Sequence, residues 1–154
     1  FVINTVLRWM STMSETTSVP DTVVFDTTPL IAYFSDESGS NRVETYLAAI
    51  EGAADGYISA VNAAELHCIV RANVGLERAD TVLAVLEESG IERIGTDETW
   101  QRAADFKFRY SLTLGNAFAL ATAAAVDGTL LTGADDDFTD VSDVSITRLR
   151  IEST

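Results

Sequence analysis

Residues 22–30 read TVVFDTTPL, and this stretch decides how the rest of the chain is interpreted. Its first four residues form a β-branched and aromatic run, which is typical of a buried strand. Asp26 follows directly, and a threonine then precedes Pro29 in what would be the first turn of a helix. The stretch therefore predicts a strand that runs straight into a helix, with a carboxylate at the junction.

Strand-like and helix-like patterns alternate along the rest of the chain. Short apolar runs predict further strands at residues 57–61, 91–94, 129–132 and 144–149. Between them, helical patterns cover residues 42–50, 63–72, 77–88, 98–110 and 113–126. Such alternation implies βαβ units with right-handed crossovers. We therefore expect an α/β fold, a three-layer sandwich with a central, mostly parallel sheet flanked by helices, formed by residues 21–154.

The first 20 residues are expected to be a flexible or non-native extension, because residues 11–20 are rich in serine and threonine and Met13 offers an alternative start. The initial apolar run contains Arg8 and lacks a following cleavage pattern, so it does not predict a signal sequence. The longest apolar stretch, residues 117–126, would cover only about 15 Å of a membrane core that is ~30 Å thick. We expect a cytoplasmic protein.

Composition excludes several classes of protein. Of the 154 residues, 47% are hydrophobic, which is too many for a disordered chain. Cys68 is the only cysteine and His67 the only histidine, so a disulfide-based module and a zinc finger are both excluded. The same scarcity gives little support to nucleophilic catalysis. Any chemistry must depend mainly on oxygen ligands and carboxylates.

The chain is strongly acidic, with a net charge of −14 from 24 acidic and 10 basic residues. This charge argues against tight tracking of a DNA backbone, which needs a basic surface. The main interpretation is a solubilising acidic coat, as in proteins of a high-salt cytoplasm. A local basic patch could still contact RNA.

Oxygen-bearing side chains follow the predicted strands. Asp26 ends the first strand, Glu65 lies just beyond the second, and Asp135 to Asp137 follow the strand at residues 129–132. Asn116 lies in the predicted first turn of the helix that precedes that strand. Ligand sites in open parallel sheets form at the carboxyl ends of the strands. Oxygen donors gathered there would suit Mg²⁺ or Mn²⁺.

Each of these residues also has an ordinary structural interpretation. Asp26 could simply cap a helix. The spacing from Asn62 to Glu65 resembles a capping box, and the three successive aspartates could form a solvated turn. His67 on an apolar helix is expected to pack at the edge of the core rather than to bind a metal.

Three segments in this order resemble the PIN domain, particularly the toxin ribonucleases of the VapC type. They are VVFDTTPLIAYF (residues 23–34), YISAVNAAELHCIV (residues 57–70) and LTLGNAFALATAAAVDGTLLTGADDDF (residues 112–138). The resemblance covers most of residues 21–150, although residues 75–110 are only generically helical. It implies a nuclease that depends on Mg²⁺ or Mn²⁺ and has a cluster of acidic residues.

Position by position, the resemblance assigns roles to individual residues. Asp26 matches the first acid of the family, Glu65 the second and Asp135 the fourth, with Asp136 and Asp137 as substitutes for Asp135. Thr27 matches the hydroxyl residue that commonly follows the first acid. The resemblance thus implies Asp26, Glu65 and Asp135 as metal ligands and, with Asn116, as the catalytic set.

Asn116 departs from the family pattern, which has an aspartate at this place. An amide oxygen can touch a cation or a bound water, but it brings no negative charge, so cation binding is weakened. The chain could be an enzyme with attenuated or altered metal use, a natural pseudonuclease, or a deliberately inactivated variant. The fold is expected to be the same in all three cases, because asparagine and aspartate are nearly isosteric.

The function implied by the resemblance is hydrolysis of RNA phosphodiester bonds by the toxin of a toxin–antitoxin pair, acting as a homodimer. Arg102, Lys107 and Arg109 are candidate phosphate contacts, although pairing with acidic residues of their own helix is the favoured interpretation. The alternative function is a catalytically silent module that binds an antitoxin-like protein or RNA. A phosphoryl-accepting domain would need an acidic pair before Asp26 or a lysine after a later strand, and the sequence has neither.

Overall fold

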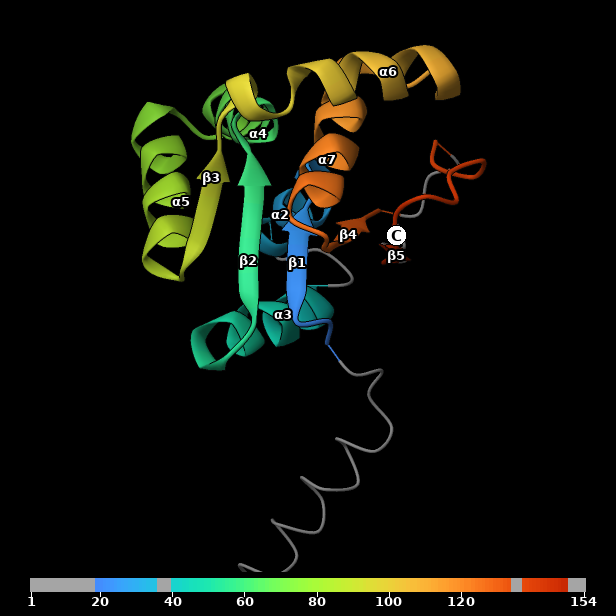
Figure 1. Cartoon of the computed structure of the whole chain (residues 1–154). Coiled ribbons are helices and arrows are strands. Elements are labelled where there is room, and N and C mark those ends of the chain that lie inside the picture. Colours follow the sequence, from blue (N-terminus) through green and yellow to red (C-terminus); the bar gives the residue numbers. More distant parts are fainter. Residues whose placement is uncertain (1–18, 36–39, 134–136, 150–154) are drawn as a thin grey trace, which may run out of the picture.

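The structure is a computed structural model, and it describes residues 19–35, 40–133 and 137–149. Five strands form one sheet in the order β3-β2-β1-β4-β5, and every pair is parallel (Figure 1). The strands are β1 (Thr22–Phe25), β2 (Asp55–Ser59), β3 (Ile91–Ile94), β4 (Thr129–Thr132) and β5 (Ile146–Arg148). The α/β prediction with a central parallel sheet is confirmed.

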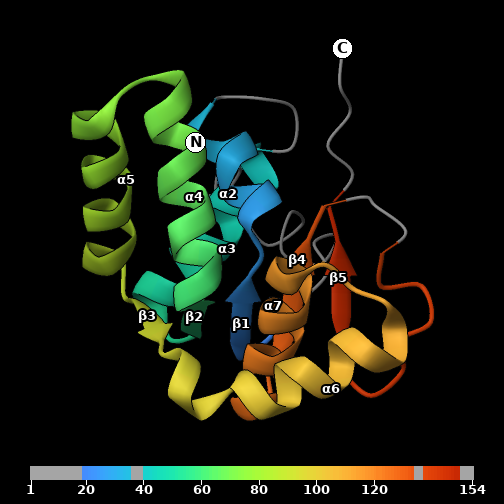
Figure 2. The ribbon, with the colours of Figure 1, turned by 90° about the horizontal axis from the view of Figure 1, so that it is seen from above.

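Helices cover both faces of the sheet (Figure 2). One layer contains α2 (Thr27–Phe34), α3 (Ser40–Gly52), α4 (Ala60–Asn73) and α5 (Leu76–Glu88). The other contains α6 (Trp100–Tyr110), which follows the 3₁₀ turn η1 (Thr96–Glu98), and α7 (Leu114–Ala125). None of the helices among the residues described here is long and apolar enough to cross a membrane.

The alternation of side chains along the strands divides the core between the two layers. Val23 and Phe25 of β1 pack in the cluster that contains α2 to α5, whereas Val24 packs with α6 and α7. In β4, Leu131 joins the first cluster and Leu130 the second. Successive residues of a strand point to opposite faces, so these apolar runs are buried on both sides. This burial on both faces explains why the central strands β1 and β4 do not alternate between polar and apolar residues.

Local capping sets where several helices begin. Asp26, Ser59 and Thr113 are the N-caps of α2, α4 and α7, and each side chain accepts a backbone hydrogen bond. The predicted strand at residues 57–61 is therefore too long at its end, because the Ser59 cap starts α4 at Ala60. The predicted strand at residues 144–149 shortens to β5, and the helix predicted from residue 98 begins at Trp100 after η1. The predicted N-terminal extension falls on residues 1–20, of which 1–18 lie outside the described part of the chain.

The two-sided core predicts a large difference between buried and exposed leucines. Leu120 in α7 is fully buried, whereas Leu76 in α5 is 48% exposed. Leu120→Ala should lower the free energy of unfolding by about 2–5 kcal/mol because it leaves a cavity in the core. Leu76→Ala, the control, should change it by less than about 0.5 kcal/mol. Urea denaturation measures both, and equal effects of the two substitutions would contradict this packing.

Candidate functional site

The central strands deliver polar side chains to one edge of the sheet. Asp26 follows β1, Ser59 ends β2 and Thr132 ends β4. Because β2, β1 and β4 are adjacent and parallel, their carboxyl ends lie together. The N-termini of α4 and α7 reach the same edge, and α6 lies across it (Figure 1). This edge is where the sequence predicts a site.

Asp26 is a buried carboxylate, with only 4% of its surface exposed. Its Oδ1 accepts the backbone N–H of Thr27 at 2.8 Å, and its Oδ2 accepts the hydroxyl of Thr132 at 2.7 Å. Its backbone N–H donates to Leu131 O at 2.9 Å, which continues the pairing of β1 with β4. The capping interpretation of Asp26 is confirmed, and these hydrogen bonds also hold the carboxylate in one place between two strands.

Glu65 lies on α4, one turn after the helix begins, and faces the first turn of α2. Its Oε1 accepts the hydroxyl of Thr27 at 3.2 Å and Nδ2 of Asn62 at 2.9 Å. Thr27 therefore links the two acids, because its backbone N–H binds Asp26 and its hydroxyl binds Glu65. The structure brings Asp26 and Glu65 to the same edge, as predicted.

The capping-box interpretation of Asn62 and Glu65 is wrong. The N-cap of α4 is Ser59, whose hydroxyl accepts the backbone N–H of Asn62 at 3.0 Å. Asn62 is fully buried, and its amide N–H₂ donates to side chains and to a carbonyl of other elements instead of capping the helix backbone. This role was not predicted from the sequence. Its one available signal was an amide that precedes Glu65 by three residues, a spacing that puts both side chains on one helical face.

Gly115 approaches Glu65 closely from α7. A Cβ atom at position 115 would lie 2.6 Å from Glu65 Oε2 and 2.7 Å from Cδ, closer than real Cβ contacts come. The carboxylate of Glu65 therefore occupies the space that a side chain at position 115 would fill. A larger residue at position 115 would displace the carboxylate of Glu65 from its present place.

Asn116 also lies in the first turn of α7, where Thr113 Oγ1 accepts its backbone N–H at 3.2 Å. Its Nδ2 donates to Asp137 Oδ2 at 2.9 Å. Asn116 is thus joined to the segment after β4, as predicted, but as a hydrogen-bond donor to one of the three aspartates. Asp135, the predicted fourth acid, and Asp136 lie outside the described residues.

The donor set at this edge suits a hard divalent cation, because it consists of carboxylate, hydroxyl and amide oxygens. Because residue 115 is glycine, the space beside its Cα is filled by the carboxylate of Glu65. In the part of the chain that the structure describes, no three acidic, histidine or cysteine side chains group closely enough to hold a metal. Of the three predicted ligands, Asp26 and Glu65 lie at this edge, and Asp135 is outside the described residues.

Two of the three basic residues of α6, Lys107 and Arg109, are engaged in contacts within the protein. Arg109 Nε pairs with Asp105 Oδ2 at 2.8 Å, and its guanidinium stacks on Phe106 and Tyr110. Lys107 Nζ donates to Leu112 O at 2.9 Å. The interpretation of Arg109 as a helix charge paired with Asp105 is confirmed.

His67 and Cys68 lie on α4 outside the site. His67 Nε2 is 2.9 Å from Asp80 Oδ1 on α5, so it joins two helices, and Cys68 is exposed.

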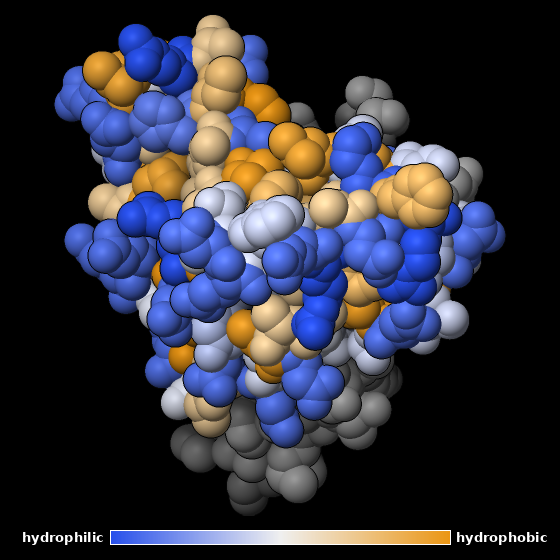
Figure 3. All heavy atoms as spheres, turned by 45° about the horizontal axis from the view of Figure 1, so that its top comes forward, coloured by the Kyte–Doolittle hydropathy of each residue, from blue (hydrophilic) through white to orange (hydrophobic). Residues whose placement is uncertain are grey.

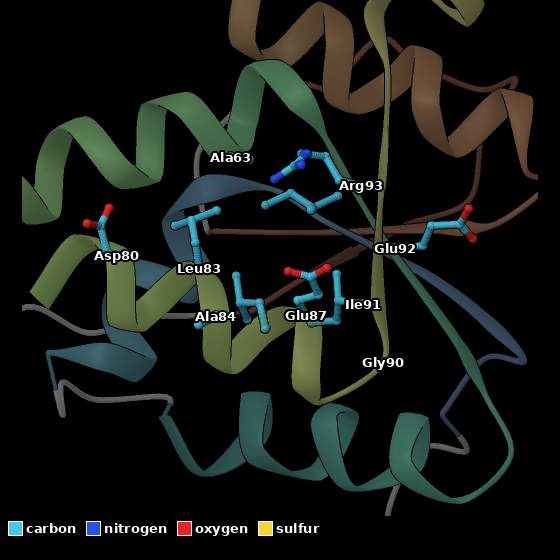
Figure 4. A pocket seen from close by; sticks show the side chains of 11 residues that line it. Ala63, Asp80, Leu83, Ala84, Glu87, Gly90, Ile91, Glu92 and Arg93 are labelled. Carbon is cyan, nitrogen blue, oxygen red and sulfur yellow. The ribbon is translucent and has the colours of Figure 1, made fainter. Parts of the chain in front are cut away.

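A cavity of about 620 Å³ lies between α5 and β3. Leu83 and Glu87 of α5 and Arg93 of β3 extend toward this space (Figure 4). Of the predicted site residues that the structure describes, Asp26, Glu65 and Asn116, none lines this cavity.

Comparison with known families identifies the family to which the fold belongs. The model of the PIN domain matches residues 23–144. The chain belongs to the PIN domain family. The resemblance to this family that the three sequence segments indicate is confirmed. A search of curated protein sequences found no match.

Solved structures show the same fold at low sequence identity. A toxin–antitoxin complex from Klebsiella pneumoniae contains a chain that is 23% identical with a TM-score of 0.62, over 81% of this chain and 95% of that one. VapBC-1 from nontypeable Haemophilus influenzae gives 13% identity and a TM-score of 0.65, over 82% and 97%. VapBC-5 from Mycobacterium tuberculosis contains a chain that is 19% identical with a TM-score of 0.53, over 86% of this chain and 100% of that one. The PIN fold therefore accounts for nearly the whole length of these relatives.

The close approach of α7 to Glu65 predicts an unusual effect of a glycine substitution. Glycine to alanine inside a helix normally stabilises a protein by about 0.5–1 kcal/mol. Gly115→Ala should instead lower the free energy of unfolding by about 1–2 kcal/mol, because Glu65 must leave its hydrogen bonds or α7 must shift.

The matched control is Gly52→Ala at the end of α3, where a Cβ would meet nothing within 4 Å. It should be neutral or stabilising in the same urea titration. A Gly115→Ala protein that is as stable as the Gly52→Ala protein would show that the edge is looser than described.

Proposed function

We propose that this PIN domain is a metal-dependent endoribonuclease that hydrolyses RNA phosphodiester bonds, and that it is the toxin of a toxin–antitoxin pair. The observation that carries the proposal is the linked pair of carboxylates at the carboxyl edge of the sheet. Asp26 and Glu65 come from different elements, yet Thr27 hydrogen-bonds to both. The Klebsiella pneumoniae relative is described as a toxin–antitoxin complex and the Mycobacterium tuberculosis relative as a member of the VapBC family of toxin–antitoxin systems, which supports the biological role.

Asp26 and Glu65 would hold Mg²⁺ or Mn²⁺, with Asp135 as the third ligand. A bound divalent cation lowers the pKa of a water molecule and neutralises charge on the phosphoryl oxygens. The protein's part is to keep its ligands in place before substrate arrives. Thr132 and the N–H of Thr27 fix the carboxylate of Asp26, and the hydroxyl of Thr27 fixes that of Glu65. Pre-organised ligands avoid reorganisation at the moment of reaction.

Binding of RNA to so acidic a chain must rely on the cation and on local contacts. Lys107 and Arg109 already bind protein groups, so they would have to exchange partners to reach a phosphate. Arg102 on α6 is exposed and is the better candidate of the three. The proposed enzyme acts in the cytoplasm. Its partner protein would block the acidic edge with basic residues, whose charge is opposite to that of the edge.

The alternative is a catalytically silent module that binds an antitoxin-like protein or holds RNA. Asn116 favours this function, because its amide brings no charge and donates to Asp137. The net charge of −14 also suits a basic peptide, whose approach the field would accelerate.

Cleavage assays distinguish the two functions. The chain should cleave structured RNA in the presence of Mn²⁺, cleavage should stop with EDTA, and Asp26→Asn should abolish it by removing a ligand charge. Asn116→Asp should raise the rate at limiting Mn²⁺ by about tenfold or more, because a further carboxylate strengthens cation binding. The rate of product formation on a labelled RNA is the measurement.

A matched control for the charge change is Asn73→Asp, an exposed position at the end of α4. It should leave cleavage unchanged. If neither the natural chain nor Asn116→Asp cleaves RNA with Mn²⁺, the nuclease proposal fails and the silent module is supported. If only Asn116→Asp cleaves, the chain is an inactivated nuclease.

We also propose that the protein forms a homodimer through the surface around α6. Phe108 is 87% exposed, and Trp100 and Leu114 are more than half exposed. On the face that includes this edge, hydrophobic side chains lie between hydrophilic ones (Figure 3). Large apolar side chains that stay exposed close together along one element commonly mark protein–protein contacts.

Phe108→Asp should convert the dimer to a monomer without changing the circular dichroism spectrum, because a charge would be buried unpaired in the interface. Leu76→Asp on α5, at a side chain that is 48% exposed, is the control and should leave the dimer intact. Light scattering after size-exclusion chromatography gives the mass. A monomeric natural chain, or a dimer that survives Phe108→Asp, would refute this interface.

A further inference from the structure

The side chain of Asn62 joins four elements at the carboxyl edge. Its Oδ1 accepts the hydroxyl of Ser59 at the end of β2. Its Nδ2 lies 2.9 Å from Glu65 Oε1 on α4, 3.1 Å from Gly115 O on α7 and 3.4 Å from Thr27 Oγ1 on α2. A buried amide is stable only when its polar atoms find partners, and here both ends of the amide do.

These contacts determine the conformation of Glu65. A glutamate on a helix surface samples several rotamers and loses entropy when one is selected. Here Oε1 receives donors from both Asn62 and Thr27, whereas Oε2 receives no hydrogen bond from the residues that the structure describes. Gly115 closes the third side, because its Cα lies against the carboxylate. One oxygen is thus held by the protein, and the group cannot rotate without losing those bonds.

The donor that Asn62 supplies cannot come from most other residues. An aspartate at position 62 would place a second carboxylate beside Glu65 and would lose both N–H groups. A leucine would leave the O–H of Ser59 without its acceptor and would remove the side-chain donor to Glu65 and to Gly115 O, and an unpaired buried polar group costs about 1–3 kcal/mol. The amide of asparagine provides both kinds of partner that this buried position needs: N–H donors for a carboxylate and a carbonyl, and an oxygen acceptor for a hydroxyl.

We infer that Asn62 is a positioning residue that sets the cation affinity of the site by holding the carboxylate of Glu65. The inference rests on the proposed function, since it assumes that Glu65 binds the cation. Residues that orient a metal ligand typically contribute about 10–100-fold to metal affinity. Asn62 should have an effect of this size although it does not itself bind the cation.

Titration of the full chain with Mn²⁺, with free Mn²⁺ followed by electron paramagnetic resonance, tests the inference. Asn62→Ala should raise the Kd for Mn²⁺ by about 10–100-fold. Asn73→Ala, an exposed asparagine in the same helix, should leave the Kd unchanged. In a Glu65→Gln background, Asn62→Ala should change the Kd by less than about twofold, because an effect transmitted through Glu65 disappears with its charge.

The double substitution separates positioning from general damage to the fold. An equal loss of affinity in the presence and absence of the Glu65 charge would overturn the inference, and so would a wild-type Kd for Asn62→Ala. If Asn62→Ala fails to fold by circular dichroism, Asn62→Ser, which keeps a hydroxyl donor, takes its place in the same cycle under the same criteria. A natural chain that binds no Mn²⁺ would instead overturn the proposed function together with this inference.

Discussion

The site depends on the parallel pairing of β1 with both β2 and β4. Phe25 is opposite Leu131 in this register, and the next N–H, that of Asp26, still donates to Leu131 O. The pairing therefore extends one residue beyond β1 and fixes the position of Asp26 at the carboxyl edge of the sheet. A shift by one residue would exchange the two faces of β1, so that Val24 would face the layer of α2 to α5 and Phe25 the layer of α6 and α7, where neither side chain fits the existing packing. Because Val23, Val24 and Phe25 are all fully buried, the register and the position of Asp26 are fixed together.

A second constraint is electrostatic. Two carboxylates at one edge repel each other, and the burial of Asp26 also removes most of its hydration. Donors on the protein offset this cost: a backbone N–H and a threonine for Asp26, and an amide and a threonine for Glu65. Hydrogen bonds to an ionised group are among the stronger ones in proteins. These donors fix the positions of both carboxylates at the edge of the sheet.

Much of the fold and part of the site could be predicted from the sequence. The features that could be predicted depend on neighbouring residues, and those that could not depend on residues far apart along the chain. The strand at residues 22–25, the cap at Asp26 and the helix begun at Thr113 depend on neighbouring residues, so local patterns were sufficient. Asn62 was misread as a cap because its partner Gly115 is 53 residues away, and no local rule reports a carbonyl on another helix. The boundary between β2 and α4 was placed two residues late for a similar reason. Ala60 and Val61 suit a strand, but the Ser59 cap determines their conformation.

Asn116 shows how one side chain alters the balance of charge at this edge. Its amide donates to Asp137, so these two positions together carry one negative charge and form a hydrogen bond. Two carboxylates at the same separation of 2.9 Å would repel each other, and they would be stable only with a shared proton or a cation between them. The amide N–H takes the place of that proton or cation. It attaches the segment after β4 to α7 without any bound ion, whereas a carboxylate at position 116 would make the attachment depend on one. The asparagine thus favours an ordered contact between Asp137 and α7 in the absence of metal. In the proposed nuclease it would also lower the negative charge available to a cation, whose binding would then depend more heavily on Asp26 and Glu65.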